Sequence, residues 1–210
     1  MFFSCNFAAY LLKMIKKLTV FAASSSDVPE IYISHTKAVG KLLAQAGIGI
    51  VYGGGGTGLM GALADAVLAH GGKVVGVMPH LLIDAERAHK GITKLISVKT
   101  MYARKRKLIH GSDGILVLAG GVGTFDEAFD AITQKKLGLY HKPIIFLNTN
   151  NYYSGLELQL AQSITQKFML PLHGQMYQFV RQPEEVLPAF ENAPKWLDDP
   201  LKYAIHLDKK

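Results

Sequence analysis

Residues 114–130 read "GILVLAGGVGTFDEAFD": an apolar run, a glycine-rich turn and a helix-like pattern. The first six residues have the length and composition of a buried strand. The apolar residues after the turn recur at helical spacing and form one stripe: Phe125, Ala128, Phe129 and Ile132. A strand that leads through glycines into a helix is the repeating unit of parallel α/β sheets. The stretch therefore predicts one such unit.

The same alternation continues along the chain. Further strands are predicted at 17–24, 48–52, 73–79, 143–148 and 178–181, each followed by a helical pattern, and a short strand is predicted within a long loop at 80–99. The first helix has an N-cap signal in "SSDVPE", with Pro29 in its first turn, and Gly47 is a candidate C-cap. These elements predict an α/β fold: a Rossmann-like, doubly wound parallel sheet with helices on both faces, in a single domain.

Bulk properties suit one globular domain, since the 210 residues are 49% hydrophobic. We expect the domain to cover 14–192, with a non-essential extension at 1–13 and a C-terminal tail at 193–210 that has no clear pattern. The apolar start "MFFSCNFAAYLL" precedes its lysines and is too short to cross a bilayer, so it predicts neither a signal peptide nor a membrane span. A single cysteine, Cys5, excludes an internal disulfide and favours a cytoplasmic location.

Charge and histidine spacing limit the partners. The formal net charge of +7 favours anionic ligands, and the dense basic run is "RKRK" at 104–107. No aromatic residues interleave with this run and no nucleic-acid motif is present, so we expect no nucleic-acid partner. A nucleic-acid-associated protein is the alternative that would use the positive charge. We also expect no membrane partner. The eight histidines lack ligand spacing, so no metal site and no cofactor are predicted.

Two glycine-rich loops follow predicted strands. The first is "GGGGTG" at 53–58 and the second is "GGVGT" at 120–124. Each leads into a helix, whose free N–H groups and dipole form an anion site, so two loops in one crevice predict a phosphorylated ligand. Tight turns that bind nothing are the alternative. The first loop matches G-x-G-x-x-G, but no acid follows at the end of the next strand, which disfavours NAD.

Thr124 and Glu127 lie three apart and fit a capping box, which needs no further function. On the predicted helix, however, Glu127 lies almost opposite the apolar stripe, and so faces solvent, a cleft or a partner subunit. In a first turn its ionised form is favoured by the helix dipole. That form suits a base, or a group that stabilises positive charge.

Arg104 shares a predicted helical face with Met101 and Leu108 and therefore points inward. A buried arginine needs an anionic partner. Glu127 or a substrate phosphate would serve, and a purely structural salt bridge is the alternative.

Three segments resemble a known family: "YGGGGTGLMGALADAVLAHGGKVVGVMP", "MYARKRK" and "LAGGVGTFDEAF". They look like the LONELY GUY (LOG) family of cytokinin riboside 5′-monophosphate phosphoribohydrolases, whose signature is P-G-G-x-G-T-x-x-E preceded by an R-K pair. The resemblance covers about residues 15–190. Ala119 stands where the signature has proline, Tyr102-Ala103 where the family has His and a polar residue, and Phe125-Asp126 where Leu-Glu is common.

The resemblance implies a Rossmann-like homodimer that hydrolyses the N-glycosidic bond of a nucleoside 5′-monophosphate such as AMP. It implies Arg104 and Glu127 as the catalytic pair. With the two glycine loops, it predicts these substrate contacts: Ser24, Gly54, Gly55, Gly56, Thr57, Glu86, Lys105, Gly120, Gly121, Val122, Gly123, Thr124, Asp126 and Thr133.

Two other functions are the alternatives to this one. The family's frequent label, lysine decarboxylase-like, requires a lysine in a recognisable pyridoxal phosphate context, and the sequence shows none. A non-catalytic nucleotide-binding or carrier protein on the same fold would keep the glycine loops without needing Glu127.

Overall fold

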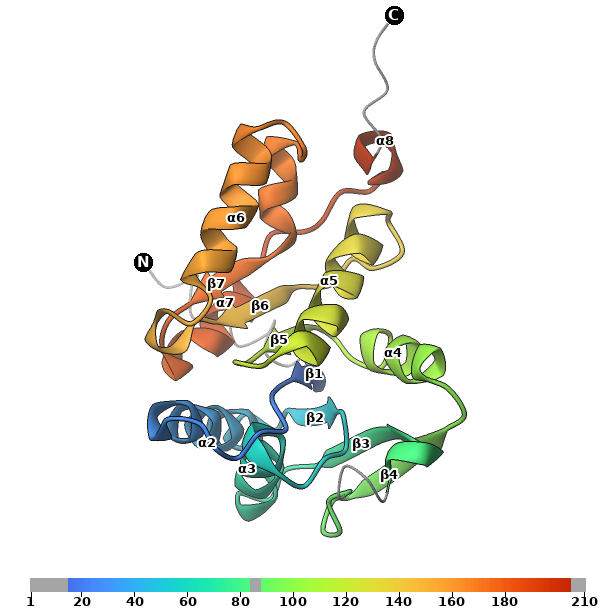
Figure 1. Cartoon of the computed structure of the whole chain (residues 1–210), viewed down its shortest axis with the longest axis vertical. Coiled ribbons are helices and arrows are strands. Elements are labelled where there is room, and N and C mark those ends of the chain that lie inside the picture. The colour runs from blue at the N-terminus through green and yellow to red at the C-terminus, as the bar shows by residue number, and fades with distance from the viewer. Residues whose placement is uncertain (1–14, 84–87, 205–210) are drawn as a thin grey trace, which may run out of the picture.

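A computed structural model describes residues 15–83 and 88–204 of the chain, and these form a seven-stranded sheet. All strand pairs are parallel, in the order β4-β3-β2-β1-β5-β6-β7. The strands are β1 (Lys17–Phe21), β2 (Gly49–Tyr52), β3 (Val74–Pro79), β4 (Lys94–Val98), β5 (Ile115–Val117), β6 (Ile144–Leu147) and β7 (Gln178–Val180). The predicted doubly wound sheet is confirmed (Figure 1).

Helices cover both faces of this sheet (Figure 1). They are α2 (Glu30–Gln45), α3 (Gly58–Ala69), α4 (Met101–Ile109), α5 (Val122–Lys136), α6 (Ser154–Thr165), α7 (Val186–Glu191) and α8 (Leu201–Ala204). Short 3-10 turns lie at His80–Leu82, Thr149–Asn151, Pro171–Met176 and Pro183–Glu185. One core lies under α2, α3 and α7, and the other lies under α4 and α5.

Strand β1 shows why the apolar runs are continuous. Its residues Leu18 and Val20 pack into the core under α2 and α3, whereas Phe21 packs into the core under α4 and α5. Successive side chains of a strand point to opposite faces, so a strand covered on both sides is mostly apolar on both. The buried Thr19 is the polar exception in β1, and its hydroxyl donates to the Leu108 carbonyl oxygen at 2.6 Å.

The chain changes direction across the sheet at β1. From β1 it proceeds to β2 and outward to β4, then returns to β5 on the other side of β1 and continues to β7. Ligands of doubly wound sheets bind at such a switch point, beyond the carboxyl ends of the strands. The topology therefore directs attention to the segments that follow β1, β2 and β5.

Several predicted helix ends need correction. Pro29 is itself the N-cap residue of α2 with extended dihedral angles, not a residue of its first turn. Helix α5 begins at Val122, and its N-cap, Gly121, makes no side-chain cap. The predicted capping box of Thr124 and Glu127 was therefore wrong, because the helix begins two residues before Thr124. The C-cap residue of α2 is Ala46 rather than the predicted Gly47, and Gly47, which follows it, has a positive φ of 72°, a conformation that is common just beyond a helix end.

Burial also departs from two predicted patterns. In the stripe on α5, Ala128 and Ile132 are buried, but Phe129 is 38% exposed. The segment after residue 192, where no pattern was found, contains α8 and the buried Trp196, whose indole N–H donates to the Lys135 carbonyl oxygen at 2.8 Å. Because Trp196 is not part of a periodic apolar pattern, the sequence pattern could not reveal this anchor.

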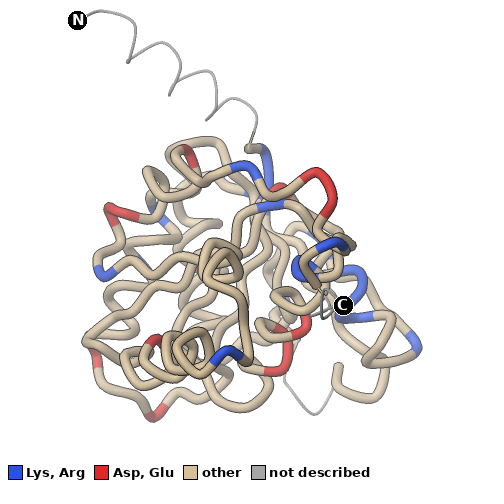
Figure 2. The backbone as a smooth tube through the Cα atoms, turned by 90° about the horizontal axis from the view of Figure 1, so that it is seen from above, with Lys and Arg blue, Asp and Glu red and all other residues tan. Residues whose placement is uncertain are grey.

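Charged residues are spread over the fold. Figure 2 shows Lys and Arg on many loops and helices, with several of these segments near one another at the right of the view, and Asp and Glu on other segments. This pattern alone does not define a nucleic-acid interface. Over the ranges that the structure describes, no helix is long and apolar enough to cross a bilayer.

Candidate active site

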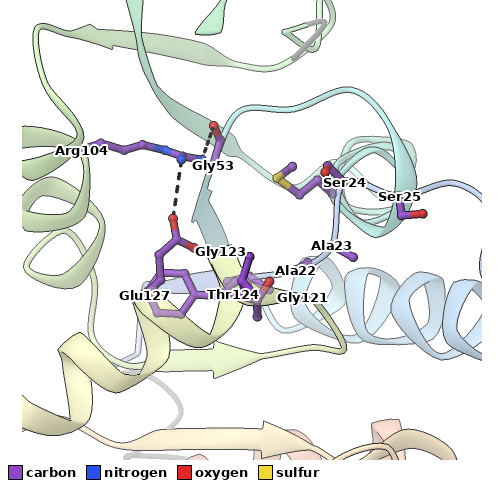
Figure 3. Close-up of a pocket in the computed structure, with 14 residues that line it drawn as sticks. Ala22, Ala23, Ser24, Ser25, Gly53, Arg104, Gly121, Gly123, Thr124 and Glu127 are labelled. Carbon is purple, nitrogen blue, oxygen red and sulfur yellow. Dashed lines mark hydrogen bonds and ion pairs between the residues drawn. The ribbon is translucent and has the colours of Figure 1, made fainter. Parts of the chain in front are cut away.

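A cavity of about 310 Å³ lies at the switch point of the sheet. Its wall combines residues 20–25 at the end of β1, Gly53 after β2, Met60 of α3, Arg104 of α4, and residues 121–124 with Glu127 of α5 (Figure 3). Segments that are distant in sequence thus meet at the carboxyl ends of β1, β2 and β5. Of the predicted site residues, the structure brings these together here: Ser24, Arg104, Gly121, Val122, Gly123, Thr124 and Glu127.

The first turn of α5 forms one wall of the cavity. Gly121 is its N-cap, and Val122, Gly123 and Thr124 are its first three residues. The N–H groups of a first turn have no partner within the helix, and the helix dipole adds partial positive charge there. A phosphate group would match this wall in charge and in hydrogen-bonding capacity.

Arg104 lines the cavity with a buried side chain, and only 7% of its surface is exposed. Its Nε donates to the carbonyl oxygen of Val77 at 3.2 Å, and its Nη2 donates to that of Gly53 at 3.3 Å. The predicted inward orientation is confirmed, although Met101 on the predicted face is 43% exposed. Because these carbonyl groups hold the guanidinium in place, it presents a fixed positive charge to the cavity.

Glu127 is the anionic partner of that arginine. Its Oε1 lies 3.8 Å from Nη1 of Arg104, and only 13% of its side chain is exposed (Figure 3). The carboxylate thus points into the cleft, one of the three environments that the sequence left open. It stands in the second turn of α5, beyond the reach of the dipole at the helix start, so its positive neighbour is the guanidinium instead.

Comparisons with known proteins agree with this geometry. A family model described as "Possible lysine decarboxylase" matches residues 60–190. A cytokinin riboside 5′-monophosphate phosphoribohydrolase of Rhodococcoides fascians is 38% identical over 157 residues, which cover 74% of this chain and 79% of that protein. One of Arabidopsis thaliana, with the same activity in its name, is 34% identical and covers 84% of each chain. The chain belongs to the LONELY GUY family.

Solved structures support the fold of this LONELY GUY protein. The molybdenum cofactor carrier protein of Chlamydomonas reinhardtii aligns with a TM-score of 0.63 and 18% identity, over 83% of this chain and 95% of that one. A molybdenum cofactor binding protein of Rippkaea orientalis aligns with a TM-score of 0.64 and 18% identity, over 83% of this chain and 94% of that one. At such identities the likeness concerns the fold alone.

The first glycine loop of this family member contributes little to the cavity wall. Only Gly53 of that loop lines the cavity. At the start of α3, the Thr57 hydroxyl donates to the Ser24 carbonyl oxygen at 3.0 Å, and the Gly58 N–H donates to the Ser26 hydroxyl at 3.2 Å. A Cβ at Gly58 would lie 2.3 Å from the Ser25 carbonyl oxygen, so glycine is needed for close packing. This helix start therefore holds the loop after β1.

The other glycines of the first loop pack against protein. Gly54 has a φ of 90° and lies against Met78, and Gly55 forms a bridge with Ala88. A Cβ at Gly61 would lie 2.5 Å from the carbonyl oxygen of Gly56. Gly54, Gly55, Gly56 and Thr57 are thus absent from the cavity wall, and their substrate contacts remain predictions.

Among the residues that the structure describes, the remaining predicted contacts of the LONELY GUY resemblance lie outside the cavity wall. Lys105 pairs with Asp126 at 3.1 Å and with Asp130 at 3.2 Å, between α4 and α5. Thr133 is exposed on α5, and Gly120 is buried behind the wall. Glu86 lies outside the described residues.

Sequence reasoning missed several cavity residues: Ala22, Ala23, Ser25, Gly53 and Met60. The first three follow β1, the strand at the switch point, and that topology was the signal that could have found them. Gly53 is needed because a Cβ there would lie 2.4 Å from Nη2 of Arg104. Met60 gave no signal, since a methionine in an apolar helix is most often core.

Proposed function

We propose that this chain hydrolyses the N-glycosidic bond of a nucleoside 5′-monophosphate, such as AMP or a cytokinin nucleotide, to free base and ribose 5-phosphate. The observation that carries the proposal is the Glu127 carboxylate, which faces the carbonyl-anchored Arg104 across a cavity whose wall is a helix start. The relatives named as phosphoribohydrolases support it.

The substrate is oriented by its phosphate. Bound at the N–H groups of Gly121–Thr124, the phosphate would place the ribose between the start of α5 and Glu127. Binding of a group that does not react holds the reacting carbon in place beside Glu127. This arrangement predicts that nucleosides without a phosphate are poor substrates.

The bond-breaking step creates positive charge on the sugar. The bond between C1′ and the base nitrogen breaks, its electron pair leaves with the base, and the sugar passes through an oxocarbenium-like state. Glu127 stabilises that charge and accepts a proton from the attacking water, whose oxygen bonds to C1′; the departing base takes up a proton. Arg104 orients the carboxylate through the 3.8 Å contact.

The test is substitution of the carboxylate. Glu127→Gln keeps the size of the side chain but removes its charge, so we expect hydrolysis of AMP to fall at least about 100-fold, in line with the loss of a general base. Free adenine is measured by chromatography for wild type and variant, with a panel of nucleoside monophosphates and the matching nucleosides as substrates.

A matched control is Glu184→Gln, which makes the same change at an exposed glutamate outside the cavity. It should retain the parental rate. If folded Glu127→Gln also retained that rate, the proposed role of Glu127 would be wrong. Binding of AMP by wild type without release of any base would favour the carrier alternative.

We also infer a homodimer, as the family resemblance implies. Its support is the set of exposed apolar side chains on the two helices that carry Arg104 and Glu127: Met101 and Tyr102 on α4, and Phe129 on α5. The ion pairs of Lys105 hold these helices side by side.

A further inference from the structure

The backbone between β5 and α5 is held by three separate hydrogen bonds. The carbonyl oxygen of Leu118 accepts from the Tyr153 hydroxyl at 2.7 Å, that of Ala119 accepts from the Ala23 N–H at 3.1 Å, and that of Gly120 accepts from the Tyr152 hydroxyl at 2.8 Å. Three successive peptide groups that lead into the cavity wall thus have fixed orientations.

Two of these donors are consecutive residues from the turn after β6. The turn is shaped by Asn150 and Asn151, which have positive φ values of 50° and 59°, and by the Asn148 side chain, which accepts from the Tyr153 N–H at 2.6 Å. A backbone conformation that few residues adopt is maintained only where the surrounding contacts determine it. Here it directs both hydroxyl groups at the same loop.

The two tyrosines differ in their surroundings. Tyr153 is 1% exposed and packs edge to face on Phe125 and Phe146, so it belongs to the core. Tyr152 is 42% exposed, and its ring meets that of Tyr32 edge to face at 5.8 Å. The Tyr152 ring also packs edge to face on the Tyr153 ring at 5.0 Å, so its hydroxyl reaches the glycine loop from a partly exposed ring at the edge of the core.

The Gly120 carbonyl shares its peptide plane with the N–H of Gly121, which lines the cavity. In a trans peptide the two groups point in opposite directions, so a donor that fixes the carbonyl also fixes the N–H. We propose that Tyr152 is a positioning residue, which aims the N–H groups at the start of α5 at the substrate phosphate by holding the Gly120 peptide. The proposal rests on the proposed function.

Tyr152→Phe tests it by removing one hydroxyl while keeping the ring. Since the phosphate is held equally before and during bond cleavage, we expect KM for AMP to rise about three- to tenfold, the size of one hydrogen bond, with kcat within about twofold. The inhibition constant of ribose 5-phosphate should rise by the same factor, because this molecule uses the same wall. A merely structural residue would not produce this separation of KM from kcat.

The matched control is Tyr32→Phe, the partner in the ring contact, whose hydroxyl has no hydrogen-bond partner among the described residues. It should behave as wild type. Equal KM values for wild type and Tyr152→Phe, or the same change in both variants, would overturn the proposal. If wild type released no base from any monophosphate, the proposed function would fail, and calorimetric binding of ribose 5-phosphate would decide the role of Tyr152: weaker binding by Tyr152→Phe supports it, and equal binding overturns it.

Discussion

Arg104 shows how single residues connect the fold to the chemistry. Its three partners, Val77, Gly53 and Glu127, come from β3, the loop after β2, and α5. A guanidinium can serve three partners because its five N–H groups spread in a plane, which a lysine ammonium cannot reproduce. The site is therefore assembled only when these elements are packed, which connects its geometry to the whole core.

The buried hydroxyl of Tyr140 takes part in no hydrogen bond among the described residues. An unsatisfied buried hydroxyl costs about 1–3 kcal/mol. We therefore expect Tyr140→Phe to raise the free energy of unfolding by about 1 kcal/mol, measured by denaturant titration.

The control is Tyr52→Phe, because the Tyr52 hydroxyl is equally buried but donates to the Gly55 carbonyl oxygen at 3.1 Å. Its loss leaves that carbonyl without the donor, so stability should fall by about 1 kcal/mol. Equal destabilisation by both substitutions would show that the Tyr140 hydroxyl has a partner after all.

At the scale of elements, the last turn of α5 anchors the C-terminal segment. The Lys135 ammonium is buried, donates to the Lys142 carbonyl oxygen at 3.0 Å and lies 5.6 Å from the centre of the Trp196 ring. Burial lowers the pKa of Lys135 to about 8. Helix α5 thus carries the active-site wall at its start and a costly buried cation at its end.

This pKa has a predictable effect on stability. Below pH 8 the folded and unfolded states both carry the proton, and burial of the charge is unfavourable. Between about pH 8 and the unfolded value of about 10.4, the unfolded state binds more protons, so stability rises with pH by up to about 3 kcal/mol. We expect the unfolding free energy of wild type minus that of Lys135→Met to increase over this window, as measured by denaturant titrations at several pH values. A difference that does not change with pH would contradict the lowered pKa.

At the scale of the whole molecule, the inferred homodimer makes a simple prediction. Light scattering should give about twice the chain mass of 22.9 kDa. Tyr102→Glu places a charge on the exposed apolar surface of α4 and should shift the protein to monomer, whereas Leu158→Glu, at a 70% exposed leucine of α6, should not. A monomeric wild type would refute the inferred dimer, and a dimeric Tyr102→Glu would place the interface elsewhere.

The fold could be predicted from sequence because buried parallel strands leave continuous apolar runs, and the loops that follow them occupy one edge of the sheet. Helical periodicity and the cost of a buried charge predicted an anionic partner for Arg104, but they left Glu127 and a substrate phosphate as alternatives, and the structure shows the contact with Glu127. The different roles within the first glycine loop could not be predicted, since close backbone packing at Gly58 and room for the Arg104 guanidinium at Gly53 favour the same residue type. The hydroxyl of Tyr152 was equally hidden, because its partner is a carbonyl group with no side-chain signature.

The three glycines of the loop before Thr124 differ in whether the protein leaves room for a side chain. A Cβ at Gly120 would lie 2.1 Å from the Thr124 hydroxyl oxygen, whereas at Gly121 and Gly123 a Cβ would meet no protein atom within 4 Å. Folding alone thus demands glycine only at the first position. Selection would therefore act against a side chain at position 120 because the protein would misfold. It would act against a side chain at 121 or 123 only because ligand binding would be lost. Drift at those two positions among related sequences would therefore record a change of ligand rather than a change of fold.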